Sequence, residues 1–272
     1  ETQVHHNRLI VSGVFQGGKS YKLTVSRAIA DIYGQQLKTP YLTRVQVEDA
    51  PPRIQIPGRR MVVLEPAAKG VFSIFSLNVE SIEYELYKVT PKDWPAYKNA
   101  MRSHARNRMI KTALPGTSLG VRHARPPGPT GRLSETPITL RPALNGGYGH
   151  VVLRVRNPKG DHHKQPHDEY RWIQITDIGI DVAYDHETLM VWVNQLKDGR
   201  PIANAEVRLG PDGQTGATKP SGLVNLALPD ATTSAGFVEV KSGQDMAFLP
   251  ENASFWHNRS DWTKRRLKTS YR

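Results

Sequence analysis

Four stretches in the last hundred or so residues decide the fold: RWIQITDIGI (171–180), LMVWVNQLKDGRPIANAEVRL (189–209), SGLVNLALP (221–229) and GQDMAFLP (243–250). Each alternates apolar and polar residues or forms a short apolar run, as strands with a buried face do. Asp198 and Gly199 separate two such runs, and an Asp-Gly pair is typical of a hairpin tip. Strands at roughly ten-residue spacing with intervening turns predict an antiparallel β-sandwich.

Within this unit we expect residues 172–182 to form one strand with a bend near Gly179. Trp172 and Trp192 lie within predicted strands, where a large aromatic side chain is typically part of the core. We assign residues 169–250 to this domain and residues 251–272 to a connector that leads to a further domain. The tryptophans of the connector, Trp256 and Trp262, are candidates for an interdomain contact.

The N-terminal stretch predicts strands without a complete domain. Residues 20–25 and 41–47 alternate with period two, and a proline pair at 51–52 ends the pattern, since proline cannot donate to a strand ladder. About fifty residues are few for a sandwich. We therefore expect residues 1–52 to be the C-terminal part of a domain that begins upstream.

Residues 53–168 predict a middle domain with strands at 53–58, 61–66 and 76–87. One helix is expected over 93–110, because Asp93 can cap its N-terminus and Pro95 suits its first turn. Residues 114–136 are rich in proline, glycine and basic residues, and we expect them to form a mobile loop longer than ordinary connections. Residues 157–168 read as a polar linker between domains.

The chain carries a formal net charge of +12 and no cysteine. The lack of cysteine excludes disulfides, thiolate metal ligands and a cysteine nucleophile. No apolar run is long enough for a transmembrane helix. Between Lys92 and Arg171 there are fifteen Lys or Arg residues and five Asp or Glu residues.

This basic stretch has two interpretations. It is either a solvated face or a surface for an anionic polymer, with Arg122, Arg125 and Arg132 as candidate binding residues. The aromatic and glycine signatures of RNA-binding modules are missing, so no nucleic-acid partner is expected.

The residues predict no catalytic or metal site. A polar loop holds the best metal candidates, which are Asp161, His162, His163, His167, Asp168 and Glu169. Their side chains suit zinc or nickel, but the loop contains proline and lysine and reads as a solvated linker. No GxSxG motif is present. Glu83 and Glu85 share a strand face, which is the usual arrangement of exposed charge. We expect no cofactor, no metal and no enzymatic activity.

The order of the four C-terminal stretches resembles the macroglobulin domains of bacterial alpha-2-macroglobulins. Further segments agree with this resemblance, namely QGGKSYKLTV (16–25), DIYGQQL (31–37), PPRIQIPG (51–58) and SLNVESIEYELYKVTPKDWPAY (76–97). The basic stretch near 114–136 matches no motif of the family.

The resemblance implies an all-β fold of tandem fibronectin- or immunoglobulin-like macroglobulin β-sandwich domains, with one short helix inserted in the middle domain. It implies a scaffold fragment of a periplasmic or cell-envelope protease trap, with other domains of the same polypeptide as partners and proteases as partners of the full-length protein. The thioester of some members requires a cysteine, which this chain lacks. The alternative is an immunoglobulin-like adhesin or a module that binds anionic envelope polymers through its 92–171 face.

Overall fold

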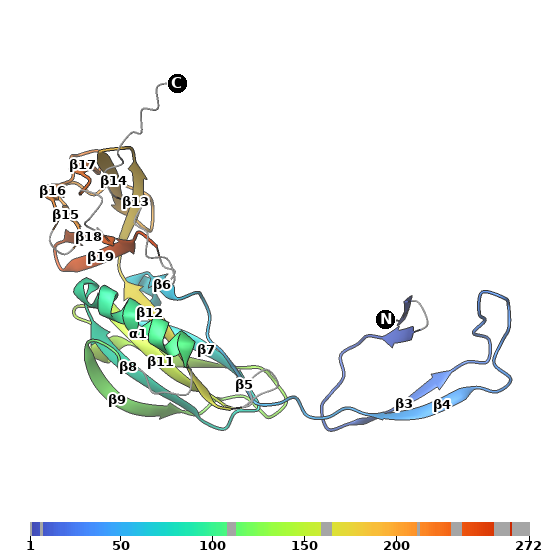
Figure 1. Cartoon of the computed structure of the whole chain (residues 1–272). Coiled ribbons are helices and arrows are strands. Elements are labelled where there is room, and N and C mark those ends of the chain that lie inside the picture. Colours follow the sequence, from blue (N-terminus) through green and yellow to red (C-terminus); the bar gives the residue numbers. More distant parts are fainter. Residues whose placement is uncertain are drawn as a thin grey trace, which may run out of the picture.

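The computed structural model describes residues 2–5, 8–107, 113–158, 165–210, 213–229, 236–252 and 262. Figure 1 shows an N-terminal arm that lies apart from a middle domain and a C-terminal domain, which are in contact with each other. Strands form nearly all of the regular structure, and α1 is the one α-helix in the described ranges. The predicted all-β sandwich fold is confirmed.

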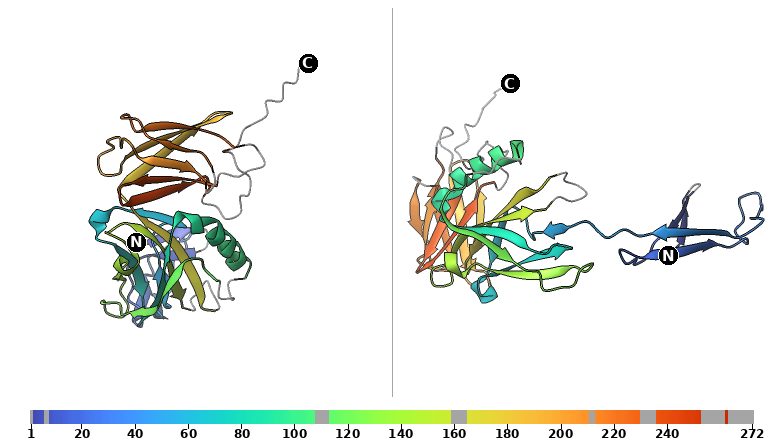
Figure 2. Two further views of the ribbon diagram at one scale, coloured as in Figure 1. Left: turned by 90° about the vertical axis from the view of Figure 1, so that its left-hand side faces the viewer. Right: turned by 90° about the horizontal axis from the view of Figure 1, so that it is seen from below.

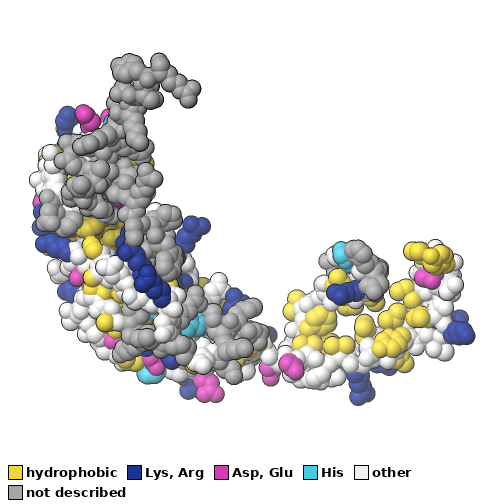
Figure 3. All heavy atoms as spheres, viewed as in Figure 1, with side chains coloured by type: hydrophobic (Ala, Val, Ile, Leu, Met, Phe, Trp, Pro, Cys, Tyr) yellow, Lys and Arg dark blue, Asp and Glu magenta, His cyan; other side chains and the backbone are white. Residues whose placement is uncertain are grey.

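The N-terminal arm consists of two separate hairpins, each a two-stranded antiparallel sheet. Their strands are β1 (Thr2–His5), β2 (Arg8–Val11), β3 (Ser20–Val25) and β4 (Tyr41–Gln46). None of the arm's described side chains is buried, and Ile32 and Tyr33 are 91% and 81% exposed. Apolar side chains line the arm in Figure 3. Within the described residues neither hairpin pairs with another sheet, and an isolated hairpin is marginally stable in water.

The middle domain is a sandwich of two sheets. The three-stranded sheet has the order β10-β7-β5 and the five-stranded sheet has the order β6-β12-β11-β8-β9. The first consists of β5 (Arg53–Gln55), β7 (Val71–Leu77) and β10 (Ser134–Thr139). The second consists of β6 (Met61–Leu64), β8 (Ile82–Val89), β9 (Thr117–Ala124), β11 (Gly149–Asn157) and β12 (His167–Ile175). Short 3-10 turns lie at η1 (Pro66–Ala68), η2 (Pro91–Asp93) and η3 (Arg141–Ala143).

The core of the middle domain lies between its two sheets. Every second residue of β8 and β11 points inward, including Leu86 and Leu153, which are both fully buried. The expected strand over 76–87 is in fact two strands, since Asn78 adopts a left-handed conformation with φ 53° and turns the chain from β7 into β8. This turn sends the chain from one sheet to the other and so closes the sandwich.

The helix begins close to its predicted start. α1 (Trp94–Arg106) follows η2, where the carboxylate of Asp93 accepts hydrogen bonds from the Thr90 backbone and hydroxyl. The predicted cap is therefore wrong in its partner: the Asp93 side chain caps η2 and makes no capping hydrogen bond to α1. The predicted end at residue 110 lies outside the described residues, but Asn107 is already extended, with φ −145° and ψ 94°, so α1 ends at Arg106 and is shorter than expected. Figure 2 shows α1 lying against the five-stranded sheet, on the face turned away from the sandwich core.

The prediction of one long loop over 114–136 is wrong. Residues 117–124 form β9, the edge strand of the five-stranded sheet, and β10 begins at Ser134. Leu119 and Ala124 pack against the core, and Gly116 and Gly120 adopt positive φ angles. An edge strand can carry glycine and basic residues because one side of it faces solvent. Its composition then resembles that of a loop, which is why the sequence predicted a loop here.

The predicted domain boundary at 168/169 is wrong as well. β12 pairs along its whole length with β11 in the middle domain, so residues 169–175 belong there. The expected interdomain linker 157–168 instead includes the end of β11 and the start of β12, two paired strands of one sheet. The single strand expected over 172–182 is split at Thr176 and Asp177. β12 lies in the middle domain, and β13 lies in the C-terminal domain.

The C-terminal domain is a second sandwich of two sheets, β13-β14-β17 and β16-β15-β18-β19. Its strands are β13 (Ile178–Tyr184), β14 (Thr188–Gln195), β15 (Glu206–Leu209), β16 (Thr215–Ala217), β17 (Leu223–Ala227), β18 (Phe237–Ser242) and β19 (Asp245–Pro250). Leu189, Val191 and Val193 of β14 point into its core. Trp192 therefore points out of the sandwich and is 37% exposed, so its assignment to the core is wrong, whereas Trp172 is fully buried as predicted.

Trp262 is buried in the core of the C-terminal domain itself. Its backbone N–H donates to Oε1 of Glu251 at 2.7 Å. This placement corrects the expectation that residue 262 belongs to a connector and contacts another domain. Trp256 lies outside the described residues.

No helix in the described part of the chain has the length and hydropathy that crossing a membrane requires.

Candidate functional site

The best-defined contact between separate elements is the junction of the middle and C-terminal domains. Ten buried side chains form one cluster there, drawn from α1, the outer face of the five-stranded sheet, and strands β18 and β19. They are Tyr87, Val89, Trp94, Tyr97, Met101, Val152, Tyr170, Trp172, Phe237 and Phe248. One continuous apolar cluster therefore includes both domains and the helix.

The ring of Phe248 is the point where the two domains interlock. Its centroid lies 5.4 Å from that of Trp172, 5.3 Å from that of Trp94 and 5.7 Å from that of Phe237. Edge-on and tilted ring pairs at these separations stabilise a contact beyond the area that they bury. Because Trp172 is in the middle domain and Phe248 is in the C-terminal domain, this packing resists relative rotation of the two.

Hydrogen bonds cross the same junction. The backbone N–H of Phe248 donates to Oε1 of Gln174 at 3.1 Å. The backbone N–H of Asp177, between the domains, donates to Oδ2 of Asp245 at 2.8 Å. The hydroxyl of Tyr148 donates to Oδ2 of Asp177 at 3.0 Å. Directional bonds around an aromatic cluster fix one orientation, because rotation would leave buried polar groups without partners.

His150 of β11 joins the two domains through its side chain. Its Nε2 lies 3.0 Å from the backbone carbonyl oxygen of Met246, so the neutral imidazole donates to it. Burial disfavours the charged form and lowers the pKa of His150 to about 4, while the bond to Met246 acts in the opposite direction. Burial raises the pKa of neighbouring Asp245, and the backbone N–H of Asp177 partly offsets that rise.

A buried ion cluster lies on the same outer face of the sheet. The guanidinium of Arg154 bonds Asp168 at 3.0 Å, Glu85 at 3.0 Å and Glu83 at 3.3 Å. Arg156 also reaches Asp168, at 3.2 Å. Burial alone would raise the pKa of the Asp168 carboxyl, but the hydrogen bonds and charges of Arg154 and Arg156 hold it below its usual value. Burial would also raise the pKa of the Glu85 carboxyl, but hydrogen bonds from Ser118, Tyr87 and Arg154 and the charge of Arg154 hold it below its usual value.

This cluster gives a structural role to Glu83, Glu85 and Asp168, which on sequence alone were candidates for exposed charges or for a metal ligand. Glu83 and Glu85 share a face, as expected, but Glu85 is only 5% exposed and both bind Arg154. Asp168, one of the metal candidates, is an ion-pair partner, and His167 lies 3.7 Å from Glu169. Asp161, His162 and His163 lie outside the described residues. Among those described, no group of three or more His, Asp or Glu side chains is placed to hold a metal ion.

The three predicted basic binding residues lie on β9 and on the loop that follows it, but only two of them line the same pocket. Arg122 is half-buried on β9, whereas Arg125 and Arg132 lie in the loop between β9 and β10 and line a pocket at the end of the middle domain remote from the junction. None of the three has an ion-pair partner among the described residues. The junction itself was missed by sequence reasoning, although the spacing of Trp94 and Tyr97 on α1 signalled an apolar helix face.

Comparison with known proteins gives one family match. Residues 175–270 match the model of the bacterial alpha-2-macroglobulin MG3 domain. The match begins at the last residue of β12, in agreement with the domain boundary in the structure. The resemblance to bacterial alpha-2-macroglobulins is thereby confirmed. No curated protein matches the chain.

Solved structures give the same fold. A crystal structure of native alpha-2-macroglobulin from Escherichia coli spanning domains MG0-NIE-MG1 covers 92% of this chain and 84% of its own, with a TM-score of 0.56 and 14% identity. A second, spanning NIE-MG1, covers 74% and 98%, with a TM-score of 0.54 and 13% identity. In a cryo-EM reconstruction of the native E. coli protein the match covers 87% of this chain and 15% of that chain, with a TM-score of 0.53 and 14% identity. At such identities the similarity shows the fold alone.

Proposed function

We propose that this chain, a row of macroglobulin-type domains resembling those of bacterial alpha-2-macroglobulins, is a non-catalytic scaffold within a protease trap of the bacterial periplasm or cell envelope. Other domains of the same polypeptide are its direct partners, and it meets proteases through the longer protein. The chain spans 15% of the reconstructed E. coli protein, so the trapping activity belongs to the whole molecule in this proposal.

The observation that carries this proposal is the junction. A scaffold must hold successive domains at a set angle while the rest of the protein changes shape. The continuous aromatic cluster and the hydrogen bonds from His150 and Gln174 supply that rigidity. The buried Arg154 is ion-paired with Glu85 and Asp168 within the fold, so its charge is used in the domain itself.

The N-terminal arm suits a chain of this kind. We propose that residues 1–52 are part of a macroglobulin-like domain completed by further sequence. Two hairpins with no buried described side chain would pack their apolar faces onto the missing strands. Slowed hydrogen exchange at β3 and β4 on extending the chain upstream would support this, and unchanged exchange would contradict it.

A protease assay tests the trap proposal at two levels. The chain alone, added to trypsin, should leave hydrolysis of both a small peptide and a large protein substrate unchanged. The longer polypeptide that contains it, once cleaved, should protect the large substrate and spare the small one. Inhibition by the chain alone, or equal inhibition of both substrates by the long protein, would contradict the proposal.

A distance measurement tests the scaffold role directly. Because the chain contains no cysteine, two cysteines can be introduced and spin-labelled without background. Exposed Glu135 on β10 and Lys219 in the C-terminal domain are suitable positions. We expect one narrow distance distribution, whereas a broad distribution would show that the two domains rotate freely.

Binding of an anionic polymer by the whole 92–171 face is less well supported. Arg154, Arg156 and Arg171 of that stretch are already paired with carboxylates. Arg125 and Arg132, in the loop between β9 and β10, carry no such pair among the described residues, and they line a pocket.

A further inference from the structure

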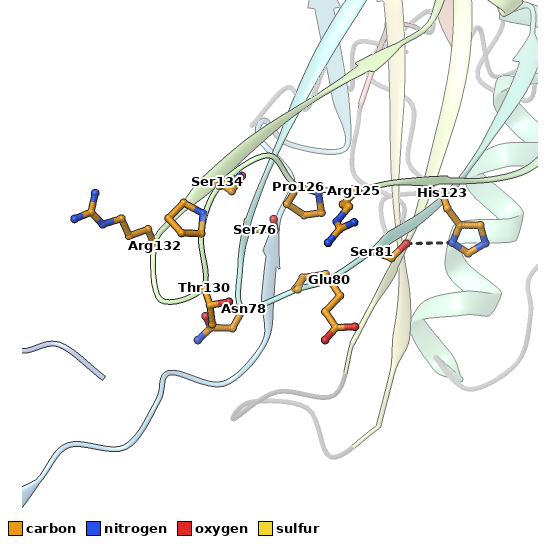
Figure 4. Close-up of a pocket in the computed structure, with 13 residues that line it drawn as sticks. Ser76, Asn78, Glu80, Ser81, His123, Arg125, Pro126, Thr130, Arg132 and Ser134 are labelled. Atoms are coloured by element: carbon orange, nitrogen blue, oxygen red, sulfur yellow. Dashed lines mark hydrogen bonds between the residues drawn. The ribbon is translucent and has the colours of Figure 1, made fainter. Parts of the chain in front are cut away.

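A cavity of about 780 Å³ opens at the end of the middle sandwich that is remote from the C-terminal domain. Its walls come from the β7–β8 turn, the end of β9 and the loop that leads into β10, as Figure 4 shows. A volume of this size is within the range of small-molecule sites. Its lining is mostly polar, with hydroxyl, amide and charged side chains from all three segments.

The pocket is held open by bonds within its own walls. The side chain of Asn78 accepts a hydrogen bond from the backbone N–H of Gly131 at 2.6 Å and donates to the carbonyl of Ala50 at 2.6 Å. The backbone N–H of Gly128 donates to Oγ of Ser134 at 3.0 Å. A Cβ at position 128 would lie 3.0 Å from that side chain, so glycine permits the close approach of the loop. The loop therefore has one defined path over the turn.

The floor of the pocket carries a buried hydroxyl without a partner. Ser76 is 1% exposed, lines the cavity, and its Oγ makes no hydrogen bond within the described structure. It occupies an inward position of β7 that continues the row of Phe72 and Ile74. On the paired strand β10 the inward row likewise changes from Ile138 to Thr136 and Ser134. An unpaired buried hydroxyl is costly, so a ligand group at this point would remove a penalty.

The two arginines of the pocket have no ion-pair partner among the described residues. Arg125 and Arg132 make no ion pair with any described residue. In Figure 4 Arg125 points across the pocket toward the side of Glu80, whereas Arg132 points away at the rim. His123 lies beside Ser81, with Nδ1 3.5 Å from its Oγ. The pocket thus offers one inward cation, a carboxylate acceptor and several hydroxyls.

We propose that this pocket binds an anionic saccharide, that is, a hydroxyl-rich sugar with one carboxylate or phosphate group per ring. Arg125 takes the anionic group, since a guanidinium fits both oxyanions with two parallel bonds. Glu80 and Ser76 bind sugar hydroxyls. The carboxylate of Glu80 repels a densely charged polyanion, so the proposal excludes nucleic acid and highly sulfated glycans. This binding role is additional to the scaffold role, and a test of one leaves the other unaffected.

Titration calorimetry on the whole chain tests the proposal with four probes: digalacturonic acid, glucose 6-phosphate, the neutral disaccharide lactose and inorganic phosphate. We expect binding of at least one of the two anionic sugars, which identifies the anionic group, and at least about tenfold weaker binding of lactose and inorganic phosphate. Absence of binding by both anionic sugars would overturn the proposal. So would inorganic phosphate that binds as tightly as the sugars, because that describes an anion site only.

Three variants locate the site. Arg125→Gln should weaken binding of the anionic sugar about tenfold or more, and Arg59→Gln, an exposed arginine elsewhere in the same domain, should change it less than about twofold. Equal losses in both would overturn the proposal in favour of diffuse electrostatic attraction. Ser76→Ala should weaken binding while leaving Tm unchanged or higher, because the free protein loses an unpaired hydroxyl. A lower Tm with unchanged binding would make Ser76 structural and would contradict its role as a ligand contact.

Discussion

The imidazole of His150 lies between two domains, where its burial makes the junction sensitive to acid. Its pKa in the folded chain is about 4, against an ordinary value of 6.5. Below pH 6.5 the unfolded chain takes up a proton that the folded chain does not, so the contribution of His150 to stability falls as the pH drops from 6.5 to about 4. The full loss is about 3 kcal/mol.

The variant His150→Gln tests this contribution. Glutamine retains a donor for the carbonyl of Met246 but does not titrate. We expect the free energy of unfolding of the wild type, relative to His150→Gln, to decline by roughly 2–3 kcal/mol between neutral pH and pH near 4 in urea titrations. Asp245, whose pKa is raised, titrates with the opposite sign in both proteins and therefore cancels in the difference. Parallel pH profiles would contradict the prediction.

Arg154 is the second residue whose loss has a defined electrostatic result. Replacing it by methionine leaves Glu85 and Asp168, which are 5% and 4% exposed, without their main cation. Removing one partner of a buried ion pair costs about 3–5 kcal/mol. We expect Arg154→Met to lose about that much at neutral pH, as measured by urea unfolding.

The pH dependence distinguishes this loss from lost packing. Both carboxyls have lowered pKa values in the folded chain, so the stability that they contribute is present above their ordinary pKa values and is lost as the pH falls. The gap between wild type and Arg154→Met should therefore narrow in acid. Arg156→Gln is the control, since that side chain is 41% exposed and its loss should cost less than about 1 kcal/mol. A gap that stays constant with pH would mean that packing, not charge, is lost.

At the scale of elements, α1 depends on the turn that precedes it. The carboxylate of Asp93 accepts the backbone N–H of Thr90 at 2.8 Å and its hydroxyl at 3.0 Å. This capping box belongs to η2, whose N-cap is Thr90, and it satisfies the backbone N–H of Thr90 in the turn from which α1 begins. Asp93→Ala should cost about 1 kcal/mol in urea unfolding. Exposed Lys92→Ala is the matched control, and an equal effect of both substitutions would show that the cap is dispensable.

For the whole molecule, the junction predicts that the middle and C-terminal domains unfold together. Phe248→Ala removes ring contacts with Trp94, Trp172 and Phe237 and should cost about 3–5 kcal/mol. In calorimetry we expect the shared transition of the wild type to separate into two. Phe72→Ala, in the core between the sheets of the middle domain, should lower stability without separating them. A single transition in Phe248→Ala would mean that the linker alone couples the domains.

The sequence by itself determined the strands and the sandwich class. Period-two alternation reports a strand with one buried face, and it placed β3, β14 and β17 near their observed bounds. Asp93 and Pro95 placed the start of α1, because proline is confined to the first turn of a helix, although the Asp93 side chain caps η2 and not α1. The order of weak motifs over residues 171–250 indicated the family. The alternation and the start of the helix depend on neighbours within a few positions, and the order of the motifs can be read along the chain without the fold.

Only the tertiary structure decided which strands belong together. The alternation of β12 shifts by one residue at Thr176 and Asp177 and then resumes in β13. Such a shift fits a bend within one strand as well as a passage between two domains, so the local pattern did not decide between them. β9 has the composition of a loop and is a strand because β8 pairs with it, and Arg154 meets Glu85 and Asp168 only across three strands. The junction and the pocket share this cause: both are built from side chains distant in sequence, and their contacts depend on sheet register, which the local pattern does not encode.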